Sequence, residues 1–198
     1  MSTPDDPLDP IPAALRHRAP PPLRVRYAQV GQAGPFPLPR KQLVEHWGQP
    51  WVEGDMVCFR RVTKASGDDG QVLEDALVVY GPDGLLDAGI YNSEGTLERW
   101  DPPQCLLPAE PAPGMRWTAT HQRGDRTSER AVELLRCADH PGCLVSQVET
   151  RRADGVMVLR MHFAEGVGYN GHEALIQQTG RPSVRSWTES LSVELRTP

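Results

Sequence analysis

Residues 73–91, LEDALVVYGPDGLLDAGIY, predict a β-hairpin, and with it the fold class. Two apolar runs, 73–80 and 85–91, flank the tetrapeptide 81–84. Its Gly-Pro-Asp-Gly sequence is a strong turn signal, because proline presets φ for a tight turn and glycine accepts a positive φ. The two runs are therefore expected to pair as antiparallel strands.

Short runs of this kind recur along the chain. Leu23, Val25 and Tyr27 alternate with polar residues, which is typical of a strand with one buried face. Residues 156–163 predict another strand, directly after a turn at 153–155. Turn signals recur every ~8–12 residues, the spacing of an antiparallel sheet. The sequence therefore predicts a mostly-β protein, built as an antiparallel half-closed barrel or a sandwich.

Composition agrees with this class and restricts the function. Of 198 residues, 20 are proline and 18 are glycine, which favours turns over long helices. A net charge of −5, with no basic run longer than a pair, argues against a nucleic-acid-binding protein. We find no apolar run long enough for a transmembrane helix and no export signal in residues 1–20, so we expect a soluble, cytoplasmic protein.

Two proline-rich segments divide the chain. Residues 1–22 contain seven prolines and are expected to form a disordered tail, either a docking peptide or a solvated leader. Residues 23–198 are expected to form a single antiparallel β domain. Within it, residues 101–114 (DPPQCLLPAEPAPG) contain five prolines and predict a crossing loop or a linker between two halves.

The second half carries turn motifs in a distinctive order. They are the run 100–108 with Pro-Pro and Leu-Leu-Pro, Pro-Gly-x-x-Trp ending at Trp117, Pro-Gly-Cys-Leu-Val at 141–145, and Phe-Ala-x-Gly-Val-Gly at 163–168. Over about residues 75–195 this order resembles a group of bacterial β-domain proteins of unknown function with a lipoprotein-like half-barrel fold. The resemblance implies a half-closed barrel and an exported protein, and it implies no reaction.

Cys137, His140 and Cys143 form a Cys-x2-His-x2-Cys cluster. Thiolate and imidazole groups are good zinc ligands, but a tetrahedral site needs a fourth ligand, which His121 or Cys105 supplies only if the fold brings it near. The favoured alternative is a plain hairpin turn, with no metal and no cofactor. The four cysteines are expected to be reduced thiols, or two disulfides if the protein is exported.

Aromatic residues and histidines are the candidates for binding. Trp47 and Trp51 are expected to be partly exposed, whereas Trp100, Trp117 and Trp187 are expected to fill the core. The candidate residues for ligand or partner binding are Trp47, Trp51, Tyr91, His121 and His162. His162 alternates with Met161 and Phe163, so it faces solvent if these two face the core.

Catalytic signatures such as Gly-x-Ser-x-Gly, His-Glu-x-x-His and the phosphate-binding loop are absent, so no catalytic residue is predicted. The favoured hypothesis is a non-enzymatic binding or scaffold protein. It would hold a protein partner or a hydrophobic ligand on the concave face or the edge of a sheet. The alternative is a small-molecule enzyme with a polar pocket inside the barrel, for which Tyr91, His121, Glu149 and His162 are the groups to test. A zinc-binding protein is the third possibility.

Overall fold

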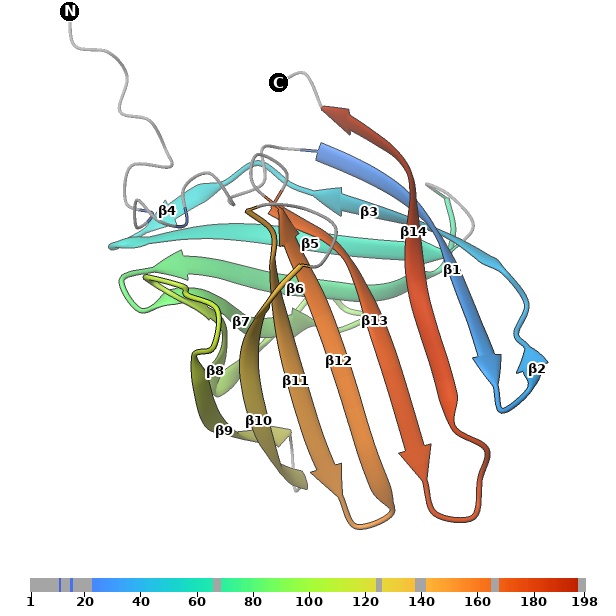
Figure 1. The fold of residues 1–198 in the computed structure, drawn as a ribbon. Helices are drawn as coiled ribbons and strands as arrows, with labels where there is room; N and C mark the ends of the chain where they lie inside the picture. The colour runs from blue at the N-terminus through green and yellow to red at the C-terminus, as the bar shows by residue number, and fades with distance from the viewer. Residues whose placement is uncertain are drawn as a thin grey trace, which may run out of the picture.

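The computed structural model describes residues 11, 15, 23–65, 69–123, 126–137, 142–164 and 168–195. Within these residues the chain forms fourteen strands of one antiparallel sheet (Figure 1). The strands are β1 (Leu23–Ala33), β2 (Phe36–Pro37), β3 (Lys41–Trp47), β4 (Trp51–Glu53), β5 (Met56–Ala65), β6 (Val72–Gly81), β7 (Gly84–Tyr91), β8 (Leu97–Pro108), β9 (Arg116–Arg123), β10 (Arg126–Arg136), β11 (Leu144–Arg152), β12 (Gly155–Ala164), β13 (Gly168–Gln178) and β14 (Val184–Leu195).

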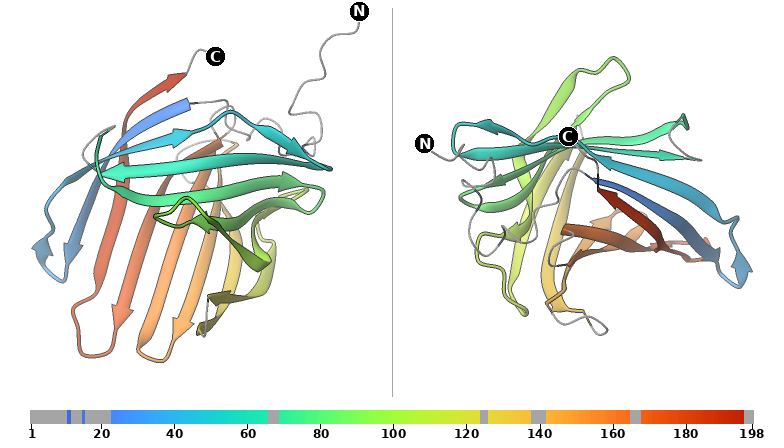
Figure 2. Two further views of the ribbon diagram at one scale, coloured as in Figure 1. Left: turned by 180° about the vertical axis from the view of Figure 1, so that it is seen from behind. Right: turned by 90° about the horizontal axis from the view of Figure 1, so that it is seen from above.

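The sheet is built from two meanders, and the first strand, β1, lies in the middle of the strand order. From β1 the chain passes through β3, β5, β6 and β7 to β8 at one edge, and from β9 at the other edge it returns to β14. β14 then pairs with β1 along the whole of β1. Because β8 and β9 contact each other, the two edges meet and the sheet forms a nearly closed barrel (Figure 2). This confirms the predicted mostly-β antiparallel fold and selects the barrel over the sandwich.

The hairpin predicted from residues 73–91 is present as β6 and β7, with Gly81 paired to Gly84. Gly84 has a φ of 129°, and a Cβ atom there would lie 2.1 Å from the carbonyl oxygen of Leu107 on β8. Only glycine fits such a position, because it must accept both the positive φ and the close approach of a neighbouring backbone. Turn chemistry alone therefore located this hairpin correctly.

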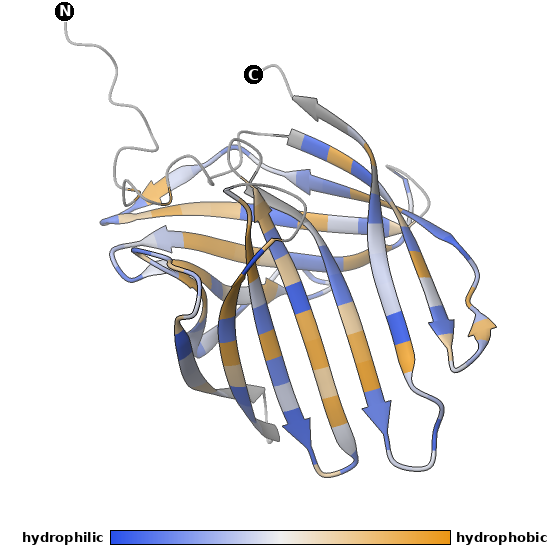
Figure 3. Cartoon of the chain, in the orientation of Figure 1, coloured by the Kyte–Doolittle hydropathy of each residue, from blue (hydrophilic) through white to orange (hydrophobic). Residues whose placement is uncertain are grey.

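Apolar side chains fill one end of the barrel interior. Phe59 lies at the centre of this core, with its ring centroid 6.1 Å from that of Trp47 and 5.6 Å from that of Tyr80, both edge-to-face. Leu134 and Phe163 complete it from the opposite wall. Figure 3 shows apolar and polar bands alternating along β10–β13, as expected when one face of each strand points inward. Burial of each large apolar side chain contributes about 1.5–3 kcal/mol, so this core holds the barrel together.

Two residues of the predicted tail belong to this core. Ile11 and Leu15 are both fully buried and pack within the main apolar cluster. The expectation of a solvated segment is wrong at these two positions, because burial of an aliphatic side chain in the apolar core is favourable. The other residues of 1–22 lie outside the described part of the chain.

The predicted crossing loop 101–114 is largely strand. Residues 101–108 belong to β8, which pairs with β7 from Gly84↔Pro108 to Tyr91↔Leu97. The prolines are tolerated because β8 is an edge strand and because the ladder is interrupted between Gln104 and Arg99, where Pro102 and Pro103 lie. The crossing itself is confined to residues 109–115.

The tryptophans divide differently from the prediction. Trp47 is buried in the core, so its predicted exposure is wrong, whereas Trp51 is 38% exposed as expected. Trp117 packs against the main core as predicted. Trp187 is half-buried, lies outside the apolar clusters, and has the Arg185 guanidinium 5.7 Å from its ring centroid.

Among the described residues, no helix has the length and apolar character that crossing a bilayer requires.

Candidate functional site

Polar side chains replace apolar ones at the inward-facing positions beyond the core. Inward-facing residues of a strand lie two positions apart. Arg61 follows Phe59 on β5, and Asp87 follows Leu85 on β7. The same change occurs on four further strands, at Glu45, Gln104, Arg130 and Thr150. These inward-facing polar side chains form a polar layer beside the apolar core.

This polar layer surrounds a cavity of about 290 Å³ inside the barrel. Its charged or titratable lining residues are Tyr27, Glu45, Arg61, Glu74, Asp87, Arg130 and His172. An apolar wall includes Val148, Leu159 and Met161. The lining comes from ten strands, so the closure of the barrel assembles the site.

Glu45 is the most deeply buried carboxyl group of the cavity, with 3% of the residue exposed. The indole N–H of Trp47 donates a 2.6 Å hydrogen bond to its Oε1 atom. Burial raises the pKa of Glu45 above its ordinary value, against the opposing effects of the nearby Arg61 charge and of hydrogen bonds from Tyr27 and Trp47. Glu45 therefore retains a proton to higher pH than an exposed glutamate.

Asp87 is the second perturbed carboxyl group. The indole N–H of Trp100 donates a 3.0 Å hydrogen bond to its Oδ1 atom. Burial raises the pKa of Asp87, and the positive charges of Arg61 and Arg130 and the Trp100 hydrogen bond oppose that effect. Two carboxyl groups on different strands, β3 and β7, thus line one cavity together with cationic side chains.

Arg130 and Thr150 carry buried polar atoms for which the described residues supply no hydrogen-bond partner. These atoms are Nε of Arg130 and Oγ1 of Thr150. Thr150 is 1% exposed, and Arg130 is half-buried. Burial lowers the pKa of Arg130 below its ordinary value, against the opposing effect of the nearby Asp87 carboxylate. An unsatisfied buried donor costs about 1–3 kcal/mol, so such groups call for a partner.

Arg61, Glu74 and His172 are further charged or titratable residues in the polar layer of the cavity, and Glu74 is more exposed than Arg61. Arg61 forms an ion pair of 2.8 Å with Glu74, whose side chain is 44% exposed, against 11% for Arg61. Burial and the Arg61 charge hold the pKa of His172 below its ordinary value, against the effect of Glu74. The neutral imidazole, which can both donate and accept a hydrogen bond, is therefore favoured at neutral pH.

Most sequence-predicted binding residues lie elsewhere. Trp47 does not line the cavity, but it lies next to two residues that do, through its hydrogen bond to Glu45 and with the Arg61 guanidinium 5.9 Å from its ring centroid. Trp51 lies on the short strand β4, and Tyr91 belongs to a second apolar cluster on the outer face, under the guanidinium of Arg60 at 4.4 Å. Glu149 forms an ion pair with Arg151 and does not line the cavity. His121 is on β9, and its side chain lies outside the described part.

His162 does point away from the core, as predicted from its buried neighbours Met161 and Phe163. Instead of lying free on the surface, it meets two cysteines. Ligand atoms of Cys137, Cys143 and His162 all lie within 4.8 Å of one another, and Sγ of Cys137 is 3.6 Å from Nδ1 of His162. His140 of the predicted cluster falls outside the described residues. Cys105, a proposed fourth ligand, lies on β8 and is not part of this group.

The cavity residues were missed although the sequence contains a signal for them. Glu45 lies in phase with Leu43 and Trp47, and Arg130 lies in phase with Val132 and Leu134. A charged residue on the apolar face of a strand predicts a polar interior site. Only the closure of the barrel shows that such positions from distant strands face one another.

Neither protein-family models, nor curated proteins, nor solved structures give a match to this chain. The resemblance to half-barrel proteins therefore stays a prediction, and function is inferred from the cavity.

Proposed function

We propose that the protein binds a small molecule inside the barrel, through a carboxylate or similar acceptor group held by Arg130 and Thr150. The observation that carries this proposal is the pair of buried, unpartnered donors in the cavity wall. A carboxylate accepts from both a guanidinium and a hydroxyl, and its charge is favoured beside a desolvated arginine.

The opposite wall suits an apolar body on the same ligand. Val148, Leu159 and Met161 offer carbon and sulfur surface, and methionine adapts to irregular shapes. A volume of about 290 Å³ is at the lower end of ligand pockets, so the ligand is compact. This keeps the ligand-binding hypothesis from the sequence but moves the site from the concave face to the interior and makes the ligand amphipathic.

The test is a binding screen with matched variants. Full-length protein is titrated calorimetrically with a panel of small aliphatic and aromatic carboxylates, each beside its primary amide. We expect one or more acids to bind, and their amides to bind at least about tenfold more weakly, since a charged hydrogen bond contributes about 1.5–3 kcal/mol.

Variants identify the site of binding. Arg130→Met and Thr150→Val are each expected to weaken binding of the acid by about tenfold or more. The control is Arg116→Met, which alters an exposed arginine that pairs with Glu133 at 2.7 Å. If no panel member binds, or if all three variants bind as the wild type does, the proposal is wrong.

A second candidate, an acid–base enzyme, is favoured by one specific observation. Glu45 and Asp87 both have raised pKa values inside a cavity, and perturbed carboxyl groups cluster at catalytic sites. Any panel compound that the wild type converts should survive incubation with Glu45→Gln or Asp87→Asn. If compounds bind but none is converted, the enzyme candidate is wrong and the binding function remains.

A further inference from the structure

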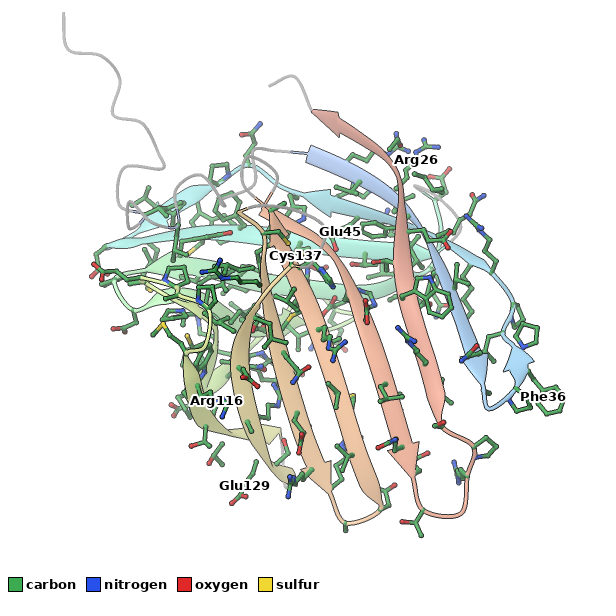
Figure 4. All side chains as sticks on the ribbon, viewed as in Figure 1. Arg26, Phe36, Glu45, Arg116, Glu129 and Cys137 are labelled. Carbon is green, nitrogen blue, oxygen red and sulfur yellow. The ribbon has the colours of Figure 1, made fainter. Side chains whose placement is uncertain are left out.

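We propose that Cys137, Cys143 and His162 form a zinc-binding site on the outer face of the barrel, separate from the interior cavity. The three residues come from the end of β10, the start of β11 and the strand β12. Figure 4 shows Cys137 at the opposite end of β10 from Glu129. The site therefore lies at one rim of the barrel.

Strand register explains why these side chains meet. Val145 pairs with Leu135 on one side and with His162 on the other, so all three point to the same face. Cys137 and Cys143 form the next pair along, with the Cys137 N–H donating to the Cys143 carbonyl at 3.2 Å. Residues two apart on a strand share a face, so both thiols join His162 on the outside.

The spacing of the ligand atoms fits a tetrahedral ion. With zinc bonds of about 2.3 Å to sulfur and about 2.05 Å to nitrogen, a tetrahedral angle separates the two atoms by about 3.6 Å. Sγ of Cys137 and Nδ1 of His162 are 3.6 Å apart. All three ligand atoms lie within 4.8 Å of one another, so small side-chain rotations bring the third to its bonding distance.

The donor chemistry selects the metal. Two thiolates and an imidazole suit zinc and other borderline or soft ions, and exclude calcium and magnesium, which take oxygen ligands. Cys143 is 6% exposed, and Cys137 and His162 are half-buried, so the ion would be partly enclosed with one side open to a fourth ligand. Bound there, it would tie three neighbouring strands together at the rim and stabilise the folded protein.

A disulfide and a metal-free thiol–imidazole pair are the two alternatives to a metal ion at this cluster. A disulfide between Cys137 and Cys143 would leave the imidazole contact unexplained, and none of the four cysteines forms a disulfide in the structure. A thiol–imidazole pair without metal involves only Cys137 and His162, and does not account for the Cys143 thiol lying within 4.8 Å of both. A metal ion uses all three side chains.

The experiment is titration of full-length, reduced protein with zinc chloride and, in parallel, cobalt chloride. We expect one zinc per chain by elemental analysis after dialysis, and a higher thermal midpoint with zinc than with a chelator. Bound cobalt should show the intense thiolate-to-metal absorption of a two-sulfur tetrahedral site. The cobalt spectrum is read on the wild type, so it does not depend on any variant folding.

Variants assign the ligands. Cys137→Ser, Cys143→Ser and His162→Gln are each expected to weaken zinc binding by at least about 100-fold, since the loss of even an outer-shell partner costs 10–100-fold. The matched control is Cys105→Ser, a cysteine on β8 that does not belong to the cluster. Zinc at well under one per chain, a cobalt spectrum without thiolate absorption, or a Cys137–Cys143 disulfide in the protein as isolated would each overturn the proposal.

Discussion

Trp47 and Glu45 lie two residues apart on β3, and a 2.6 Å hydrogen bond joins the indole nitrogen of one to the carboxyl oxygen of the other. Trp47 packs edge-to-face on Phe59 in the apolar core, whereas Glu45 lines the cavity. The hydrogen bond therefore connects the two layers of the barrel interior. A tightly packed core fixes the position of Glu45, so the cavity wall is expected to be rigid on this side.

The first prediction concerns pH. Folding raises the pKa of Glu45 above 4.5, so the folded protein keeps this proton at pH values at which the unfolded chain releases it. The stability that depends on this proton is complete below about pH 4.5 and is lost as the pH rises through the folded pKa.

Glu45→Gln, which is neutral at every pH, should therefore gain stability relative to the wild type between about pH 4 and pH 7. Urea denaturation at each pH measures the difference. Glu129→Gln, an exposed change on β10, serves as the control. A difference that is constant with pH would contradict the raised pKa.

The second prediction separates stability from binding at Thr150. The Thr150 hydroxyl is buried without a partner in the described structure. Thr150→Val should therefore raise the free energy of unfolding of the ligand-free protein by about 1 kcal/mol or more, while it lowers the affinity for the ligand. Ser146→Ala is the matched control, since Ser146 has a buried, unpartnered hydroxyl but does not line the cavity. It should leave binding unchanged. Equal effects of the two variants on affinity would show that Thr150 has no special role.

The third prediction tests the anchoring of the N-terminal segment. Leu15 is fully buried, so Leu15→Ala should cost about 2–5 kcal/mol in denaturant unfolding. Leu38→Ala, at a position that is 38% exposed, should cost much less. A cost for Leu15→Ala no larger than for Leu38→Ala would contradict the burial of Leu15 in the core.

The fourth prediction concerns the turn that identified the fold. Gly84→Ala places a Cβ atom against the Leu107 carbonyl oxygen and should destabilise the protein by about 3 kcal/mol or more. Gly95→Ala also meets a positive φ, of 78°, but has no atom within 4 Å of the new Cβ, so it should cost about 1 kcal/mol. Thermal unfolding of both variants measures the contrast, and similar costs would count against the close approach of β7 and β8.

Features set by neighbouring residues could be predicted from the sequence. The hairpin at 81–84 and the outward direction of His162 both follow from local turn chemistry and alternation. The strand character of 101–108 could not, because it depends on β8 being an edge strand and on a register break that accommodates Pro102 and Pro103. Likewise, only the tertiary structure shows that Leu15 reaches the core.

The candidate sites required pairings that span the chain. Glu45 and Thr150 face one cavity only because β1 pairs with β14 and the barrel closes. The sequence marks Cys137 and Cys143 as possible metal ligands, but the third member of their cluster, His162, lies 25 residues beyond Cys137 and joins them through the β11–β12 register. Alternation along a strand can indicate which face a residue lies on. It cannot indicate which residues of distant strands will lie beside it.

Nuclear magnetic resonance of the arginine Nε–H groups tests most directly whether the interior cavity is a binding site. In protein carrying nitrogen-15 in its arginine side chains, saturation with a bound carboxylate should shift the Arg130 signal and slow its exchange with water, while the Arg116 signal stays in place. A ligand that binds without moving the Arg130 signal, or a protein that binds no member of the panel, would contradict a binding site in the cavity.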